Sequence, residues 1–136
     1  MSYKYGKTSN KRLDTCHPDL IRLFDYALLH PDCPCDITIV CGERGREAQE
    51  KAFCDGKSKA KFGQSPHNFE PSYAVDAAPY VKGVGIPWDD KSLFRELAAH
   101  IKACADDLGI HVTWGGNFKS FCDMPHWEIT HWRACI

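Results

Sequence analysis

The chain has 136 residues, the size of one ordinary domain, and we expect residues 1–136 to form a single domain with its own core. Its net charge of -1 argues against a protein that binds nucleic acid through a basic surface. No apolar run reaches the roughly 18 residues of a membrane span, and the polar start lacks the apolar core of a secretory signal. We therefore expect a protein that is made in the cytoplasm and does not associate stably with membranes.

The first half of the chain predicts a helix, a strand and a second helix. Thr15 is a candidate cap for the first helix, with Pro18 in its opening turn. The apolar face of this helix has five members: Leu20, Ile21, Phe24, Ala27 and Leu28. Alternating apolar residues predict a strand over 36–41, and residues 46–53 can form a short helix.

The second half begins with a loop-like stretch, residues 55–72, and contains the strongest helix pattern. Asp89 or Asp90 can cap this helix and Gly109 can end it. Its apolar positions follow the 3.6-residue period: Phe94, Leu97, Ile101, Cys104 and Leu108. Short strands are predicted over three ranges: 73–80, 110–114 and 125–129. Helices on one side of a small, mostly antiparallel sheet predict an α+β fold.

The sequence contains eight cysteines, which is many for this length. A disulfide framework is typical of secreted domains, and a cysteine zinc site normally shows paired C-x-x-C knuckles. The closest pair here is Cys33 and Cys35, while Cys41 and Cys104 fall on apolar faces like ordinary buried thiols. We expect most cysteines to be reduced and structural, with one or two disulfides near Cys33, Cys35 or Cys135 as the alternative.

Three polar residues stand where a purely structural role is hard to justify. Asp76 lies among small apolar residues of a predicted strand, where a carboxylate is costly unless it is paired or bound to a cation. His126 lies two residues before Glu128, so strand alternation places both on one face. With His67 from the preceding loop, two histidines and a carboxylate make a catalytic zinc set with one position left for water. Taken singly, each could be a core histidine or a carboxylate paired with an arginine.

Four short motifs carry a family resemblance. In chain order they are Gly42-Glu-Arg44 with Gln49, Ser65-Pro-His67, Ala74-Val-Asp76, and Asp123-Met-Pro-His126-Trp-Glu128. This order resembles the group of zinc D,D-carboxypeptidases, D-Ala-D-Ala dipeptidases and phage L-alanyl-D-glutamate endopeptidases, which shares its fold with the Hedgehog signalling domain. The opening residues 1–9 and the Trp114-Gly-Gly turn also resemble the phage endolysins of that group. The resemblance covers nearly the whole chain.

The resemblance implies a zinc peptidase site in which zinc-bound water is the nucleophile. The implied metal ligands are three residues: His67, Asp76 and His126. Asp123 is implied as the catalytic acid/base, which takes a proton from water and passes it to the leaving amine. Arg44 is implied as the group that polarises the scissile carbonyl or holds the oxyanion, although it could instead form a structural ion pair. Glu128 is the alternative base, or a partner that fixes a ligand imidazole, and Gln49 is expected to orient its neighbours.

Two features depart from the family pattern. Eight residues, 68–75, separate His67 from Asp76 and include no glycine, whereas the family has a shorter segment that contains one. The loop that carries His67 is therefore expected to take a different path and to reshape the substrate cleft. Asn117 stands after Trp-Gly-Gly, where relatives often carry an aspartate.

The leading interpretation is a monomeric, phage-type endolysin that hydrolyses the L-alanyl-D-glutamate bond of the peptidoglycan stem peptide. Such a protein needs no signal peptide, because it reaches the cell wall after the membrane has been permeabilised. The first alternative is a D-Ala-D-Ala carboxypeptidase or dipeptidase with the same site. The others are a zinc-binding module without catalysis and a disulfide-stabilised structural protein whose histidines are incidental.

Overall fold

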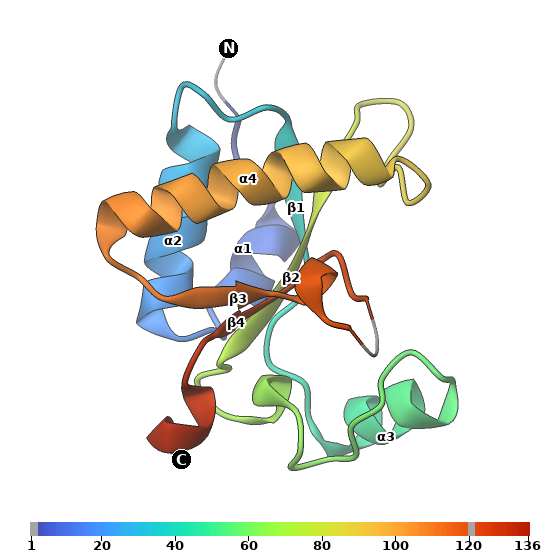
Figure 1. The fold of residues 1–136 in the computed structure, drawn as a ribbon. Helices are drawn as coiled ribbons and strands as arrows, with labels where there is room; N and C mark the ends of the chain where they lie inside the picture. The colour runs from blue at the N-terminus through green and yellow to red at the C-terminus, as the bar shows by residue number, and fades with distance from the viewer. Residues whose placement is uncertain (1–2, 120–121) are drawn as a thin grey trace.

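The centre of the fold is a four-stranded antiparallel sheet. The computed structural model describes residues 3–119 and 122–136, so Met1 and Ser2 of the opening motif lie outside the described residues. The strands lie in the order β1-β2-β4-β3, and every neighbouring pair is antiparallel. Their bounds are Asp36–Cys41 for β1, Ala74–Tyr80 for β2, Val112–Trp114 for β3 and His126–Ile129 for β4. The expected α+β fold with an antiparallel sheet is confirmed (Figure 1).

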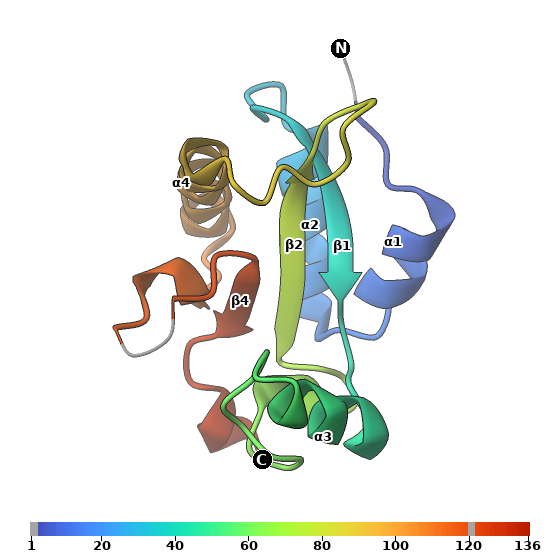
Figure 2. The ribbon, with the colours of Figure 1, turned by 90° about the vertical axis from the view of Figure 1, so that its right-hand side faces the viewer.

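Four α-helices surround this sheet. They are α1 (Lys7–Leu13), α2 (Pro18–Leu29), α3 (Arg46–Cys54) and α4 (Lys91–Leu108). Figure 2 looks onto β1 and β2, with α2 behind them and α3 below their lower ends. Three short 3-10 helices complete the described structure: Pro66–Asn68, Gly115–Asn117 and Trp132–Cys135.

The core lies between the sheet and the apolar faces of α2 and α4. The buried face of α2 consists of Leu20, Leu23, Phe24, Ala27 and Leu28. The buried face of α4 consists of Phe94, Leu97, Ala98, Ile101, Cys104 and Ala105. Phe24 meets the fully buried Trp127 of β4 edge to face, with ring centroids 6.4 Å apart. This contact ties α2 to the strand that carries His126.

The N-terminal helix α1 is not expected from the sequence, because its seven residues bury only Ser9 and Leu13. It is held by contacts with the outer strand β1. The Ser9 hydroxyl accepts a hydrogen bond from Ile39 N at 3.0 Å, and Arg12 donates to Ile39 O at 3.1 Å. These bonds occupy backbone groups at the edge of the sheet, which would otherwise be open to pairing with another chain.

The start of α2 also differs from the expectation. His17, not Thr15, is the cap: its Nδ1 accepts a hydrogen bond from Asp19 N at 3.1 Å. Thr15 instead donates to Arg12 O at 2.7 Å and accepts from Glu43 N at 2.8 Å. Its hydroxyl therefore joins the turn before α2 to the segment after β1. The expected strand over 110–114 is shorter, beginning at Val112.

All eight cysteines are free thiols. Cys16, Cys35 and Cys104 are buried, as expected of structural thiols. The alternative with a disulfide near Cys33, Cys35 or Cys135 is not present in this structure.

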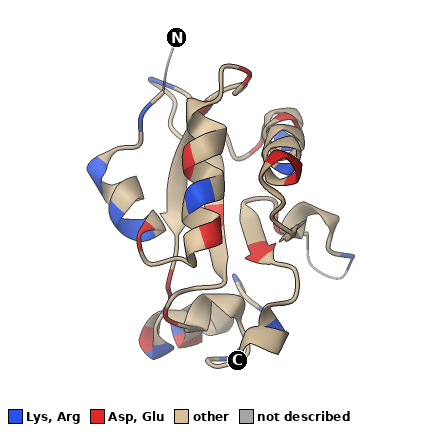
Figure 3. Ribbon diagram, turned by 90° about the vertical axis from the view of Figure 1, so that its left-hand side faces the viewer, with Lys and Arg blue, Asp and Glu red and all other residues tan. Residues whose placement is uncertain are grey.

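The surface carries both signs of charge. Basic positions (blue) and acidic positions (red) alternate along α2 and occur together on α4 (Figure 3). This mixture agrees with the net charge of -1. Among the described residues, no helix combines the length and the apolar character that crossing a membrane requires.

Gly42 is predicted to be essential for the packing of the turn after β1. A Cβ at this position would lie 2.2 Å from Arg12 O and 2.3 Å from Thr15 Oγ1, so Gly42→Ala must shift the backbone. We expect a loss of about 1–3 kcal/mol in the free energy of unfolding, the usual cost of overpacking. Gly45→Ala is the matched control, because its Cβ would approach only Glu43 Oε2, at 3.9 Å. Urea denaturation of both variants measures the difference, and equal midpoints would contradict the prediction.

Candidate metal centre and active site

The three residues expected to hold zinc converge on one point. Asp76 and His126 are direct partners across β2 and β4, so their side chains lie on the same face of the sheet. His67 reaches the same point from the 3-10 helix Pro66–Asn68. His67 Nε2 and His126 Nδ1 each lie 3.2 Å from Asp76 Oδ1, and the two nitrogens are 3.3 Å apart.

The other ring nitrogen of each histidine has a fixed acceptor. His67 Nδ1 lies 2.8 Å from Gly42 O, and His126 Nε2 lies 2.7 Å from Glu128 Oε1. Since both partners can only accept, we assign the ring hydrogens to these nitrogens. In each neutral imidazole the remaining nitrogen then carries a lone pair, and both lone pairs face Asp76. Metal-bound histidines in proteins are oriented in this way.

This donor set fits a zinc ion. Two nitrogen lone pairs and a carboxylate oxygen face one another, and the histidines are only 2% and 6% exposed, so a positive charge is needed between them. Four ligands placed tetrahedrally at zinc distances lie roughly 3.3 Å from one another. The observed separations of 3.2, 3.2 and 3.3 Å match this spacing. Three protein ligands are also the number that a catalytic zinc site uses.

The titration behaviour of the three residues reflects the same need for a cation. Burial disfavours charged imidazoles, but the Asp76 carboxylate outweighs it and raises the pKa of His67 to about 10. For His126, Asp76 and Glu128 likewise outweigh burial and raise the pKa to about 9. Burial also opposes ionisation of Asp76, yet the two histidines hold its pKa well below the usual range. Without metal, protons take the place of the cation.

Asp123 lies beside this cluster and its carboxylate is available. An Asp123 oxygen, an Asp76 oxygen and a His126 ring nitrogen lie within 4.8 Å of one another. Burial and the negative charge of Asp76 raise the pKa of Asp123. Gly115 makes this position possible, because a Cβ there would lie 2.3 Å from Asp123 O and 2.8 Å from His126 Cβ. Among the described residues, no hydrogen bond engages the Asp123 carboxylate.

Glu128, the alternative base, has both oxygens engaged. Oε1 accepts from His126 Nε2 at 2.7 Å, and Oε2 accepts from Trp132 Nε1 at 3.1 Å. This arrangement fixes the orientation of the His126 ring. It favours a supporting role for Glu128 over that of a proton acceptor.

Arg44 lines the cleft, and two nitrogens of its guanidinium group have polar partners. Nη2 is 3.5 Å from Asp76 Oδ2, and Nη1 donates to Gln49 Oε1 at 2.9 Å. Gln49 is fully buried, and its Nε2 donates to Ala60 O at 2.7 Å and to Ser58 Oγ at 3.0 Å. Gln49 therefore orients Arg44 and fastens the segment after α3 to the site. Arg44 therefore forms an ion pair with Asp76, as the alternative structural role requires. Among the described residues it pairs with no second carboxylate.

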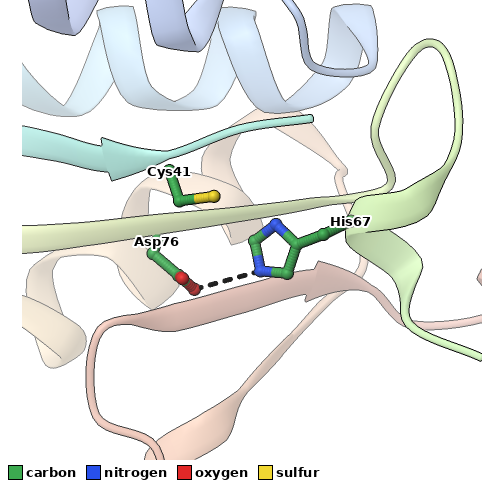
Figure 4. Close-up of side chains that lie close together, drawn as sticks. All are labelled: Cys41, His67 and Asp76. Carbon is green, nitrogen blue, oxygen red and sulfur yellow. Dashed lines mark hydrogen bonds and ion pairs between the residues drawn. The ribbon is translucent and has the colours of Figure 1, made fainter. Parts of the chain in front are cut away.

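Cys41 is a member of the site that the sequence analysis missed. It was expected as an ordinary buried thiol, but it is only partly buried and lines the cleft. Its Sγ lies within 4.8 Å of a His67 ring nitrogen and an Asp76 oxygen (Figure 4). Burial opposes the thiolate, but His67 outweighs it and the pKa of Cys41 is lowered. The register between β1 and β2 shifts between Ile39 and Cys41, and this shift places Cys41 opposite Asp76.

These residues open onto a cleft of about 580 Å³. Its lining includes Cys41, Arg44, His67, Asp76, Asp123, His126 and Glu128. All five residues predicted as metal ligands or catalytic groups are therefore together in one cleft. Four of the other histidines, at positions 17, 30, 100 and 111, lie outside it.

The two departures from the family pattern are not among the residues that line the cleft. Ser72, in the longer segment after His67, is fully buried; its N–H donates to Thr15 O at 2.9 Å and its carbonyl accepts from His17 N at 2.8 Å. None of residues 68–75, all of which the structure describes, lines the cleft. Asn68, at the start of the segment, donates to Arg44 O at 3.0 Å and to Gln49 Oε1 at 3.1 Å, so the segment supports the cleft from behind. That its path reshapes the cleft relative to the family stays a prediction. Asn117 is exposed and also lies outside the lining.

Comparison with known proteins gives consistent matches along the chain. Residues 1–131 match the model of the phage L-alanyl-D-glutamate peptidase family. The chain is 32% identical to the L-alanyl-D-glutamate peptidase of Escherichia phage T5 over 129 residues, which cover 95% of this chain and 90% of that protein. It is 31% identical to the peptidoglycan L-alanyl-D-glutamate endopeptidase of Bacillus subtilis (strain 168) over 109 residues, 69% of this chain and 60% of that protein.

Solved structures add a similar fold. The crystal structure of the Serratia marcescens L-Ala D-Glu endopeptidase superimposes with a TM-score of 0.80 at 26% sequence identity. The match covers 98% of this chain and 95% of that one.

Zinc binding at pH 7 is predicted to release protons. In the metal-free protein the raised pKa values of His67 and His126, about 10 and about 9, mean that the metal must displace protons. Apparent affinity should therefore rise with pH and level off above pH 9 to 10. The same protons also stabilise the metal-free fold. Their full contribution to the free energy of unfolding is present below the ordinary histidine pKa of 6.5, and it is lost as pH rises through the pKa values of about 9 and about 10 in the folded protein. Calorimetry in buffers of different ionisation enthalpy counts the protons, and a count of zero would refute the prediction.

Glu128→Ala is predicted to weaken zinc binding by roughly 10–100-fold, because the His126 ring loses the acceptor that fixes it. Competition with a chromogenic chelator measures this affinity. Glu47→Ala, which removes an exposed carboxylate on α3, is the control. An unchanged affinity combined with lost turnover at saturating zinc would instead make Glu128 the base.

Proposed function

The chain belongs to the phage L-alanyl-D-glutamate peptidase family, and we propose that it is a zinc-dependent peptidase that cleaves the L-alanyl-D-glutamate bond of peptidoglycan. Residues 1–136 would act as one zinc peptidase domain. The observation that carries this proposal is the convergence of three acceptor atoms, 3.2–3.3 Å apart, on the floor of a cleft. The Asp123 carboxylate and the Arg44 guanidinium border these atoms.

Three side chains would hold the zinc: His67, Asp76 and His126. Bound zinc supplies Lewis-acid chemistry, because it polarises a carbonyl and makes water acidic enough to react near neutral pH. The protein's own contribution is to keep the three donor atoms in place. Gly42 O and Glu128 Oε1 hold the two imidazole rings in the required tautomers.

Asp123 would be the general base and acid of the reaction. It borders the cluster, its carboxylate is not consumed by hydrogen bonds within the described chain, and its pKa is raised by burial and by Asp76. A carboxylate with these properties can take the proton of the attacking water and return it to the leaving amine. Arg44 would place its positive charge where the carbonyl oxygen becomes negative.

We further propose that the protein acts as a phage endolysin on the bacterial cell wall, after the membrane has been permeabilised. Its support is the family model, which describes phage peptidases. The substrate would be the peptidoglycan stem peptide, bound by a monomer.

Digestion of purified peptidoglycan tests the proposed bond. The zinc-loaded protein should release new L-alanyl carboxyl ends and new D-glutamyl amines, both identified by mass spectrometry and amine labelling. A chelator should abolish the release, and added zinc should restore it. Free D-alanine as the product would instead indicate a D-Ala-D-Ala carboxypeptidase or dipeptidase, and zinc binding without any cleavage would indicate a binding module.

Asp123→Asn is predicted to lower kcat by roughly 10²–10⁴-fold, the usual loss when a general acid/base is removed. The amide keeps the size of the side chain but cannot take up a proton. Zinc content should stay near that of the unchanged protein, because Asp123 is not one of the three proposed ligands. Asp106→Asn removes an exposed carboxylate from α4 and serves as the control. Full activity of Asp123→Asn would remove Asp123 from the mechanism.

A further inference from the structure

A second hollow lies beside the cleft, at Asp123. This hollow has a volume of about 470 Å³, and it shares Lys57, Trp88, Asp123 and Pro125 with the lining of the metal cleft. The two spaces therefore adjoin each other, with Asp123 at the border between them. The far side of the hollow is the first part of α4, which lies above the end of α3 in Figure 2.

The hollow is basic. Lys57, Lys91 and Arg95 line it, all three are exposed, and Asp123 is the one acidic residue of its described lining. Within the described part of the chain, none of the three cations lies in an ion pair with a carboxylate. A peptide or other ligand with negative charge would meet three cations here that no salt bridge of the described chain holds.

The cations on α4 are not explained by the stability of the helix. Lys91 is the first residue of α4, where the helix dipole disfavours positive charge. Arg95 follows four residues later on the same side of the helix, and like charges at this spacing repel each other. Both positive charges are unfavourable for the helix, and both side chains line the same hollow. A negatively charged ligand explains these two residues better than helix stability does.

The hollow also has an aromatic wall. Trp88 is 55% exposed, and its ring stacks on the buried Phe94 with centroids 5.8 Å apart. Phe94 thus fixes the Trp88 ring while one side remains open to solvent. A flat apolar surface beside three cations suits a ligand with a short carbon skeleton and a carboxylate.

We propose that this hollow is the leaving-group subsite, in which Lys57, Lys91 and Arg95 bind the free carboxylate of the D-glutamyl residue. This inference rests on the proposed function, in which Asp123 returns a proton to the leaving amine. The residue that carries this amine must then lie next to Asp123, and we place it in the hollow, whose lining includes Asp123 but none of the three proposed metal ligands. A D-glutamyl residue has two carboxyl groups, and only one continues the peptide. The other is a carboxylate close to the scissile bond, and the basic hollow is placed to bind it. The L-alanyl side of the substrate would lie on the opposite side of the metal.

The test compares two soluble stem peptides that differ in one group. In the first, the D-glutamyl carboxyl that does not continue the chain is free; in the second, it is an amide. We expect kcat/KM of the unchanged protein to be on the order of tenfold higher for the carboxylate, since each exposed cation contributes modestly. In Lys91→Gln/Arg95→Gln this ratio should fall severalfold, because Lys57 alone remains of the three cations. Lys102→Gln, which removes the same charge from α4 outside the hollow, should keep the ratio.

A binding measurement separates this inference from the proposed function. The product peptide with an N-terminal D-glutamyl residue is titrated into the zinc-loaded protein, and the double variant should bind it roughly tenfold more weakly than the Lys102→Gln control. Equal ratios and equal affinities in the double variant and the control would overturn the subsite. Failure of the unchanged protein to cleave peptidoglycan would overturn the proposed function, and the titration would still decide whether the hollow binds the carboxylate.

Discussion

The structure around the cleft depends on one electrostatic constraint: two imidazole nitrogens and a carboxylate oxygen, all of which can accept hydrogen bonds, face one another. His67 Nε2, His126 Nδ1 and Asp76 Oδ1 are mutually 3.2–3.3 Å apart. Such a group is stable only around a cation, whether protons or a metal ion. The neighbouring bonds preserve this condition, because Gly42 O and Glu128 Oε1 occupy the other ring nitrogens. The strand pairing of Asp76 with His126 makes the arrangement part of the sheet itself.

The same constraint explains why small residues surround the site. Asp76 lies in a strand whose neighbours Ala74, Val75, Ala77 and Ala78 are buried, so the strand packs tightly while its carboxylate points to the cleft. Gly42 lets the turn after β1 approach Arg12 and Thr15, and this approach positions the carbonyl that fixes His67. Gly115 lets the end of β3 pack against Asp123 and His126. A side chain at position 42 would displace the site indirectly, through the turn, whereas one at position 115 would press directly on Asp123 and His126.

The sequence predicts those elements whose signals are local. The strand over 36–41 and the helix ending at Gly109 follow from alternation, periodicity and a left-handed C-cap with φ of 69°. Helix α1 has no such signal, because its stability comes from bonds to β1. Cys41 was placed inward by strict alternation with Ile37 and Ile39, but the register shift turns it towards Asp76. The grouping of the metal and catalytic residues came from the order of motifs, since spacing alone left single-residue explanations open.

The structure also bears on the choice between two carboxylates near His126. The two-residue spacing in His126-Trp127-Glu128 places Glu128 on the same face as the histidine, and this proximity is the reason why Glu128 is a poor candidate for the base. Its two oxygens are already bound by His126 and Trp132. Protonating Glu128 would weaken the bond that keeps the metal-facing nitrogen free of hydrogen. In the described chain the Asp123 carboxylate accepts no hydrogen bond from a ligand ring. Its raised pKa lets it hold a proton more readily than an ordinary aspartate. One carboxylate can then carry protons while the other keeps the ligand ring fixed.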